Sequence, residues 1–158
     1  MHVKKIIDEW FSDYKKPSMF ICTCTCDWKC CIEGGFDVTV CQNSEIAKLP
    51  TLNIQDSTIV DRYLNNPITS AIVIGGLEPF LQFKELHSLI KAFREETDDD
   101  IVIYTGYYPK ELAEILSQIK ERNIVIKYGR FKQNSTKKYD DILGVTLISN
   151  NQYTERLN

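Results

Sequence analysis

The stretch AIVIGGLEP, Ala71 to Pro79, is typical of a buried strand that runs directly into a tight turn. Four apolar residues precede Gly75 and Gly76, where the backbone can bend and a ligand can approach closely because no Cβ intervenes. Apolar residues then recur at helical spacing, at Phe83, Leu86, Leu89, Ile90 and Phe93. A strand, a glycine turn and an amphipathic helix together predict one βα unit of a parallel sheet.

The same alternation continues on both sides of this unit. We expect further strands at residues 19–24, 101–104 and 124–126, and a less clear one at 142–148. Helices should begin at Asp56 or Ser57 and at Pro109. Four or five strands are too few to close an eight-stranded barrel. The sequence therefore predicts an α/β fold, a partial (truncated) parallel β/α barrel, in a single domain that spans residues 1–158.

The N-terminal segment has apolar residues at a spacing that suits a helix rather than a strand. They are Val3, Ile6, Ile7, Trp10, Phe11 and Tyr14. We therefore expect an amphipathic N-terminal helix that ends before Pro17.

Composition and charge narrow the classes of function. The formal net charge is -3, which gives no support to nucleic-acid binding. No run approaches the ~20 apolar residues of a membrane helix, and the N-terminus lacks the apolar core of a secretory signal. We expect a cytoplasmic protein without a membrane partner, and a reducing cytosol favours metal binding or redox chemistry over structural disulfides.

All six cysteines fall between Cys22 and Cys41, so they could not staple distant parts of a fold. Cys26 and Cys30 form a CxxxC pair that a loop can wrap around one cluster, and Cys41 follows in the same segment. Three thiolates would fill three irons of a [4Fe–4S] cube and leave the fourth open to another ligand.

The other cysteines have alternative interpretations. Cys22 and Cys24 lie on the first predicted strand and are typical of small buried hydrophobic residues. Cys31 could replace Cys30 or Cys41 as a ligand. The rival metal is zinc, which usually takes paired CxxC motifs that this chain lacks.

Three turns of the predicted sheet should lie together. The cysteine segment follows the first parallel strand, Gly75 and Gly76 follow the second, and Thr105 with Gly106 follows the third. Sites in parallel α/β folds gather at the C-terminal ends of the strands. The basic residues near the next turn, Lys127, Arg130, Lys132, Lys137 and Lys138, are expected to form a solvated surface loop, or else to touch an acidic partner or a cofactor carboxylate.

These motifs resemble those of the radical S-adenosylmethionine (SAM) enzymes, most closely the small activating proteins of anaerobic ribonucleotide reductase. Residues 41–43, CQN, look like the last cysteine of their CxxxCxxC loop, and residues 75–79, GGLEP, look like their GGEP motif. Two departures mark a divergent subfamily. Ten residues, instead of two, separate the second and third cysteines, and Leu77 is inserted within GGEP.

The resemblance implies a cofactor, a reaction and partners. Backbone groups at Gly75, Gly76 and Glu78 would receive the methionyl amino group of SAM, Pro79 would fix the turn, and Thr105 would line the ribose or the carboxylate. Flavodoxin or ferredoxin would reduce the cluster. The resulting 5'-deoxyadenosyl radical would take a hydrogen atom from a glycyl-radical enzyme, such as anaerobic ribonucleotide reductase. The alternatives are a non-catalytic 4Fe-4S protein for electron transfer or sensing, and a structural zinc protein.

Overall fold

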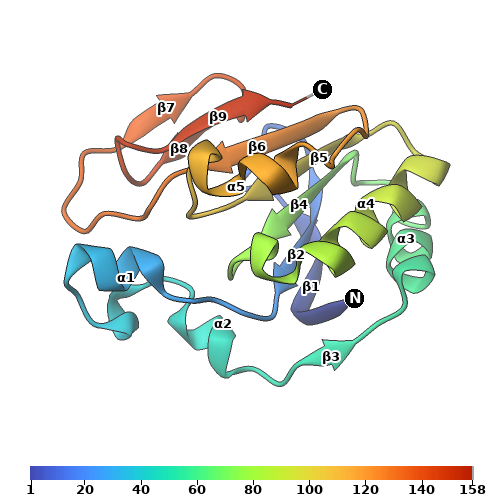
Figure 1. Ribbon diagram of the computed structural model, residues 1–158. Helices are drawn as coiled ribbons and strands as arrows, with labels where there is room; N and C mark the ends of the chain where they lie inside the picture. The colour runs from blue at the N-terminus through green and yellow to red at the C-terminus, as the bar shows by residue number, and fades with distance from the viewer. Residues whose placement is uncertain (158) are drawn as a thin grey trace.

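A computed structural model describes residues 1–157, and its centre is a mixed sheet of seven strands (Figure 1). Four strands in the middle run parallel, each pairing with the next: β2 (Ser18–Thr23), β4 (Ala71–Gly75), β5 (Asp100–Tyr104) and β6 (Ile124–Tyr128). Antiparallel strands extend both sides of this group: β1 (His2–Trp10) and β3 (Leu52–Asn53) beyond β2, and β9 (Tyr153–Arg156) beyond β6. The predicted parallel strands are therefore present, between antiparallel strands that the sequence pattern did not predict.

Three helices cover one face of this sheet, on the near side in Figure 1. They are α3 (Asp56–Leu64), α4 (Phe83–Glu96) and α5 (Pro109–Leu116). Their apolar sides bury the inward isoleucines of the strands, among them Ile72, Ile74 and Ile101. The prediction of these three helices is confirmed, and their burial supplies most of the apolar core.

The opposite face of the sheet has a smaller core. Phe20, Val73, Val102 and Val125 point toward this face, and Leu143 packs against them from the C-terminal region. That region also holds a separate two-stranded sheet of β7 (Lys138–Asp140) and β8 (Val145–Leu147). The expected strand at 142–148 is thus β8, and it belongs to this hairpin rather than to the parallel sheet.

The prediction of an N-terminal helix is wrong, because residues 2–10 form the strand β1. Its pairing with β2 shifts between Val3 and Lys5, and again between Ile7 and Trp10. Each shift inserts one extra residue, so that side chains three apart face the same way. Val3 and Ile6 accordingly join the helix-covered core, while Ile7 and Trp10 join the other one. Two irregularities in a strand thus imitate the spacing of a helix.

The cysteine segment, residues 26–43, contains short helical turns instead of a continuous loop. These are α1 (Lys29–Gly34) and the 3-10 turn η1 (Val38–Val40), followed by α2 (Ser44–Lys48). Trp28 precedes α1 with a φ of 58°, which is unusual for a residue with a side chain. The segment is therefore folded back in compact turns below the sheet in Figure 1.

At the starting ends of the parallel strands, Asp100 collects three partners. Its carboxylate accepts hydrogen bonds from the Tyr14 hydroxyl at 2.8 Å, from Lys16 Nζ at 2.9 Å and from Arg156 Nη1 at 2.9 Å. Burial alone would raise the pKa of Asp100, but these hydrogen bonds outweigh it and lower that pKa to about 2. At this end of the sheet, the charge of Asp100 is therefore paired within the protein.

Candidate metal centre

The four parallel strands end side by side at a cavity of about 690 Å³. Three turns that follow these strands contribute glycines to its wall, at Gly76, Gly106 and Gly129. The cavity opens on the face of the sheet that α3, α4 and α5 do not cover, since Ile7, Phe20 and other residues of that face line it. The expectation that the strand-end turns meet in one place is confirmed.

Cys26, Cys30 and Cys41 all line this one cavity. The turns of α1 and η1 fold the segment back, so that three cysteines spread over sixteen residues of the sequence border the same space. Cys22 is a fourth cysteine in the wall, although it also packs in the core of the sheet as the sequence suggested. Four of the six thiols therefore border the cavity.

The remaining two cysteines do not line it. Cys24 points to the other side of the sheet, where its Sγ lies 3.1 Å from Gln82 Oε1. Cys31 is buried within the cysteine segment. The suggestion that Cys31 replaces a neighbouring ligand therefore has no support from the cavity wall.

Burial raises the pKa of three of the cavity thiols, those of Cys22, Cys26 and Cys30. It raises the pKa of Cys26 to about 12 and that of Cys22 to about 11. Burial also raises the pKa of Cys30, against the opposing effect of Arg130 and Lys127. Iron binding at these residues would release protons, as thiolate ligation generally does.

The cysteines that line the cavity match the ligand number of a cluster. A [4Fe–4S] cube takes each thiolate on a different iron, so three cysteines around one cavity suit that group. Among residues 1–157, no group of three His, Cys, Asp or Glu side chains is gathered as it would be around a single metal ion.

Two glycines of the cavity wall allow a cysteine to pack closely against their backbone. A Cβ at Gly106 would lie 3.0 Å from Cys30 Sγ, and one at Gly76 would lie 3.2 Å from Cys22 Cβ. Gly76 also has a φ of 81°, which favours glycine. At Gly75 the neighbouring strand leaves little space for a side chain, because a Cβ there would lie 3.0 Å from Tyr104 Cβ.

The predicted cofactor residues occupy two positions relative to the cavity. Gly76 lines it, whereas Gly75, Glu78, Pro79 and Thr105 lie outside its wall. Pro79 is buried at the start of the 3-10 turn η2 (Pro79–Gln82). Their contact with a cofactor stays a prediction.

Glu78 joins the three turns that follow β2, β4 and β5. Its backbone N–H donates to the Thr25 carbonyl at 2.8 Å. Its carboxylate accepts from the Thr105 hydroxyl at 2.7 Å and from the Gly106 N–H at 2.9 Å. Burial raises the pKa of Glu78 to about 7, although these hydrogen bonds oppose the shift. Glu78 and Thr105 therefore fix the shape of the cavity from behind its wall.

Two basic residues contradict the prediction of a solvated loop. Lys127 is 7% exposed and lines the cavity, and Arg130 is 5% exposed. Lys132, Lys137 and Lys138 are exposed as expected. The signal that could have identified Lys127 is its place inside an apolar strand, IVIKY, where a charged residue needs a reason.

Lys127 has few partners of its own. Its ammonium group lies 3.4 Å from the Gly129 carbonyl and 5.6 Å from the centroid of the Tyr104 ring. Burial lowers its pKa to about 8, so the group is still mostly charged at pH 7. A buried cation with one long hydrogen bond at a cavity wall is suited to receive an anionic group.

Comparison with known protein families identifies the family of the chain. The family model of the 4Fe-4S single cluster domain matches residues 16–153, which include all six cysteines and every strand-end turn described above. This chain belongs to that family. A search of curated proteins and a search of solved structures each found no match.

As a 4Fe-4S single cluster domain, the protein binds an iron–sulfur cluster, and the cavity at the strand ends is the candidate place for it. Cys26, Cys30 and Cys41 are the residues that would hold the cluster, and Cys22 is the additional thiol within the same wall. None of the helices in residues 1–157 is long and apolar enough to cross a membrane.

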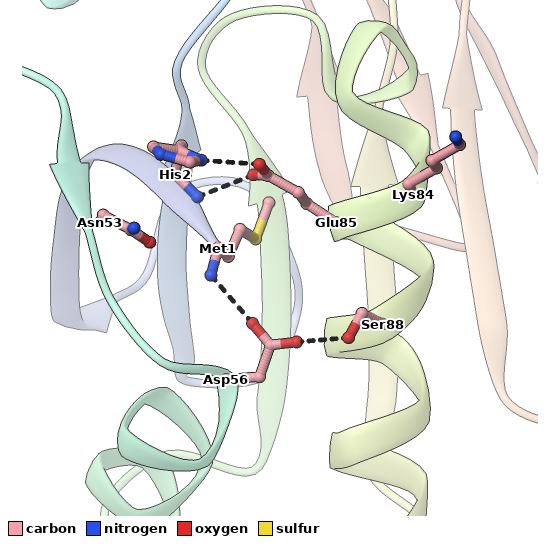
Figure 2. Close-up of a pocket in the computed structure, with 7 residues that line it drawn as sticks. All are labelled: Met1, His2, Asn53, Asp56, Lys84, Glu85 and Ser88. Carbon is pink, nitrogen blue, oxygen red and sulfur yellow. Dashed lines mark hydrogen bonds and ion pairs between the residues drawn. The ribbon is translucent and has the colours of Figure 1, made fainter.

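A second cavity, of about 250 Å³, lies on the helix-covered side of the sheet (Figure 2). Its polar groups are largely paired with one another. The N-terminal ammonium group lies 3.0 Å from Asp56 Oδ1, Ser88 donates to Asp56 Oδ2 at 2.7 Å, and His2 Nδ1 lies 2.6 Å from Glu85 Oε1. These internal pairs hold β1 against α3 and α4, and we assign no ligand to this cavity.

Proposed function

We propose that this protein is a radical SAM activating enzyme, which uses its [4Fe–4S] cluster and SAM to abstract a hydrogen atom from a partner protein. The observation that carries the proposal is the composition of the cavity wall. Three cysteines from one segment share that wall with Gly76 and Gly106, which belong to the second and third strand-end turns. Three thiolates leave one iron for another ligand.

The chain's own residues would bind and orient that ligand. When the cluster and SAM are bound, the reduced cluster supplies the electron that cleaves the sulfonium. Gly76 lines the cavity, where its backbone would receive the methionyl amino group, and Glu78 and Thr105 hold the turns around it. The Lys127 ammonium is the candidate partner for the carboxylate of SAM.

The side from which the cavity is reached supports the proposal of a large substrate. The cavity is reached from the side that α3, α4 and α5 leave uncovered, as a partial β/α barrel would allow. A glycine-bearing loop of a glycyl-radical enzyme, such as anaerobic ribonucleotide reductase, is the partner that we propose for this side. Flavodoxin or ferredoxin would supply the electron.

Cys22 favours a second candidate function. Its side chain borders the same cavity, so a fourth thiolate could complete the cluster and exclude an added ligand. The protein would then carry electrons or sense redox state without turning over SAM. The two functions differ in one property, which is whether an iron of the cluster can accept SAM.

Electron paramagnetic resonance of the reduced cluster distinguishes the two. The protein would be reconstituted anaerobically with iron and sulfide, reduced with dithionite, and measured with and without SAM. We expect SAM to change the spectrum, and methionine and 5'-deoxyadenosine to appear in the same sample. The Cys22→Ser variant should behave like the parent chain. A spectrum that ignores SAM in the parent and responds to it only in Cys22→Ser would establish the electron-carrier alternative.

A further inference from the structure

Arg130 joins the cysteine segment to the sheet through several charge-assisted hydrogen bonds. Its Nε and Nη2 donate to the two carboxylate oxygens of Glu33, each at 3.0 Å. Nη2 also donates to Glu111 Oε1 at 2.6 Å, and Nη1 donates to the Gly106 carbonyl. The guanidinium group therefore contacts the end of α1, the start of α5 and the turn after β5 at once.

The start of α1 is attached to the same region by different residues. The Tyr107 hydroxyl donates to Asp27 Oδ2 at 2.6 Å. Lys29 Nζ lies 3.3 Å from Glu111 Oε1 and 4.5 Å from the centroid of the Tyr107 ring. Contacts at both ends therefore hold α1, which carries Cys30 and Cys31, against the turns after β5 and β6.

The helix itself contributes little to its own stability. It has six residues, far fewer than the roughly 12–15 that an isolated helix needs in water. Its preceding residue, Trp28, makes no side-chain hydrogen bond to cap it, and neither acidic residues in its first turn nor basic ones in its last turn favour its dipole. The position of Cys30 thus depends on contacts with the rest of the protein.

We propose that Arg130 is a positioning residue for the cluster: through Glu33 it holds α1 against the strand-end turns, so that Cys30 faces the cavity before iron arrives. This inference concerns cluster binding alone, and SAM plays no part in it. Because a bidentate pair fixes orientation as well as distance, its loss should loosen the cluster while leaving the core intact.

Glu33→Gln is the appropriate variant for the test, because the Glu33 side chain is 54% exposed while its partner is buried. The matched control is Glu114→Gln, which makes the same charge change at an exposed glutamate of α5. Both proteins would be reconstituted anaerobically, and loss of cluster absorbance to an iron chelator would be followed in time.

We expect the cluster of Glu33→Gln to be lost about fivefold faster than that of the parent chain, as suits one half-exposed bidentate pair. Glu114→Gln should match the parent. The thermal midpoint of the metal-free protein should be the same in all three proteins. A general structural role for Glu33 would instead lower the midpoint of Glu33→Gln. Equal chelation rates in the two variants would overturn the proposal.

A double-mutant cycle with Arg130→Gln tests the named partner. If Glu33 acts through Arg130, adding Glu33→Gln to Arg130→Gln should not accelerate cluster loss further. Fully additive effects would show that Glu33 acts through something else, and the assignment to Arg130 would then be withdrawn.

Discussion

Two buried charged residues, at opposite ends of the same four parallel strands, differ in how completely they are paired. At the starting end, Asp100 is held by Tyr14, Lys16 and Arg156 at 2.8–2.9 Å. At the finishing end, Lys127 is as deeply buried but has a single hydrogen bond, of 3.4 Å, and faces a cavity. The Asp100 carboxylate is paired within the protein, whereas the Lys127 ammonium group has capacity left for a further partner. The difference marks the finishing end as the candidate functional end.

The largest effect that this comparison predicts is the loss of iron from cysteine variants at the finishing end. Cys26→Ala, Cys30→Ala and Cys41→Ala should each lose most of the iron bound after anaerobic reconstitution, because each removes a ligand from the cavity wall. Cys24→Ala is the control, since Cys24 faces away from the cavity. Iron and sulfide assays give the result. Full retention of iron in Cys41→Ala would contradict the assignment of Cys41 as a ligand and would make Cys22 the third ligand.

At the starting end, a substitution should change stability and leave the iron content alone. Asp100→Asn removes the charge that Lys16 and Arg156 share. A pKa lowered from 3.8 to about 2 corresponds to about 2 kcal/mol of stabilisation at pH 7. We expect the free energy of unfolding of the metal-free protein, measured in urea, to fall by about that amount. A loss of iron in this variant would break the division between the two ends.

Lowering the pH should reduce the free energy of unfolding by a smaller amount, because it protonates the same Asp100 carboxylate. Because the pKa of Asp100 is lower in the folded than in the unfolded chain, its stabilisation is complete above about pH 4 and is lost as the pH falls toward 2. When the pH falls from 6 to 3, the contribution of Asp100 to the free energy of unfolding should therefore decrease by about 1 kcal/mol. The measurement is the difference between the parent chain and Asp100→Asn in urea at each pH. A constant difference across this range would contradict the assignment.

The regular part of the fold could be predicted from the sequence because its periodicity is local. In the strand at Ala71–Gly75 and in the helices after it, the apolar residues have the spacing that is typical of a strand or of a helix. β1 could not be predicted, since its two register shifts come from pairing with β2 rather than from its own residues. The antiparallel β9 is short, and only its pairing with β6 identifies it.

The candidate site was predictable to a different degree. The cysteines could be proposed as cluster ligands because all six thiols are concentrated in one segment, and the family match supports a 4Fe-4S cluster. Which cysteines face the cavity depends on the turns α1 and η1, and the inclusion of Cys22 follows only from the way β2 borders the cavity. The buried position of Arg130 depends on partners that are distant in sequence, such as Glu33. Those long-range contacts leave no periodic signal.

Trp10 borders the cavity, and Trp28 lies in the segment between Cys26 and Cys30, so both tryptophans of the chain belong to the neighbourhood of the cluster. An iron–sulfur cluster absorbs in the near ultraviolet and visible, where indole emits, and quenches light from rings beside it. The protein therefore carries its own optical reporter. Its intrinsic fluorescence would follow cluster arrival and oxidative loss in real time, without a label and at concentrations too low for iron assays.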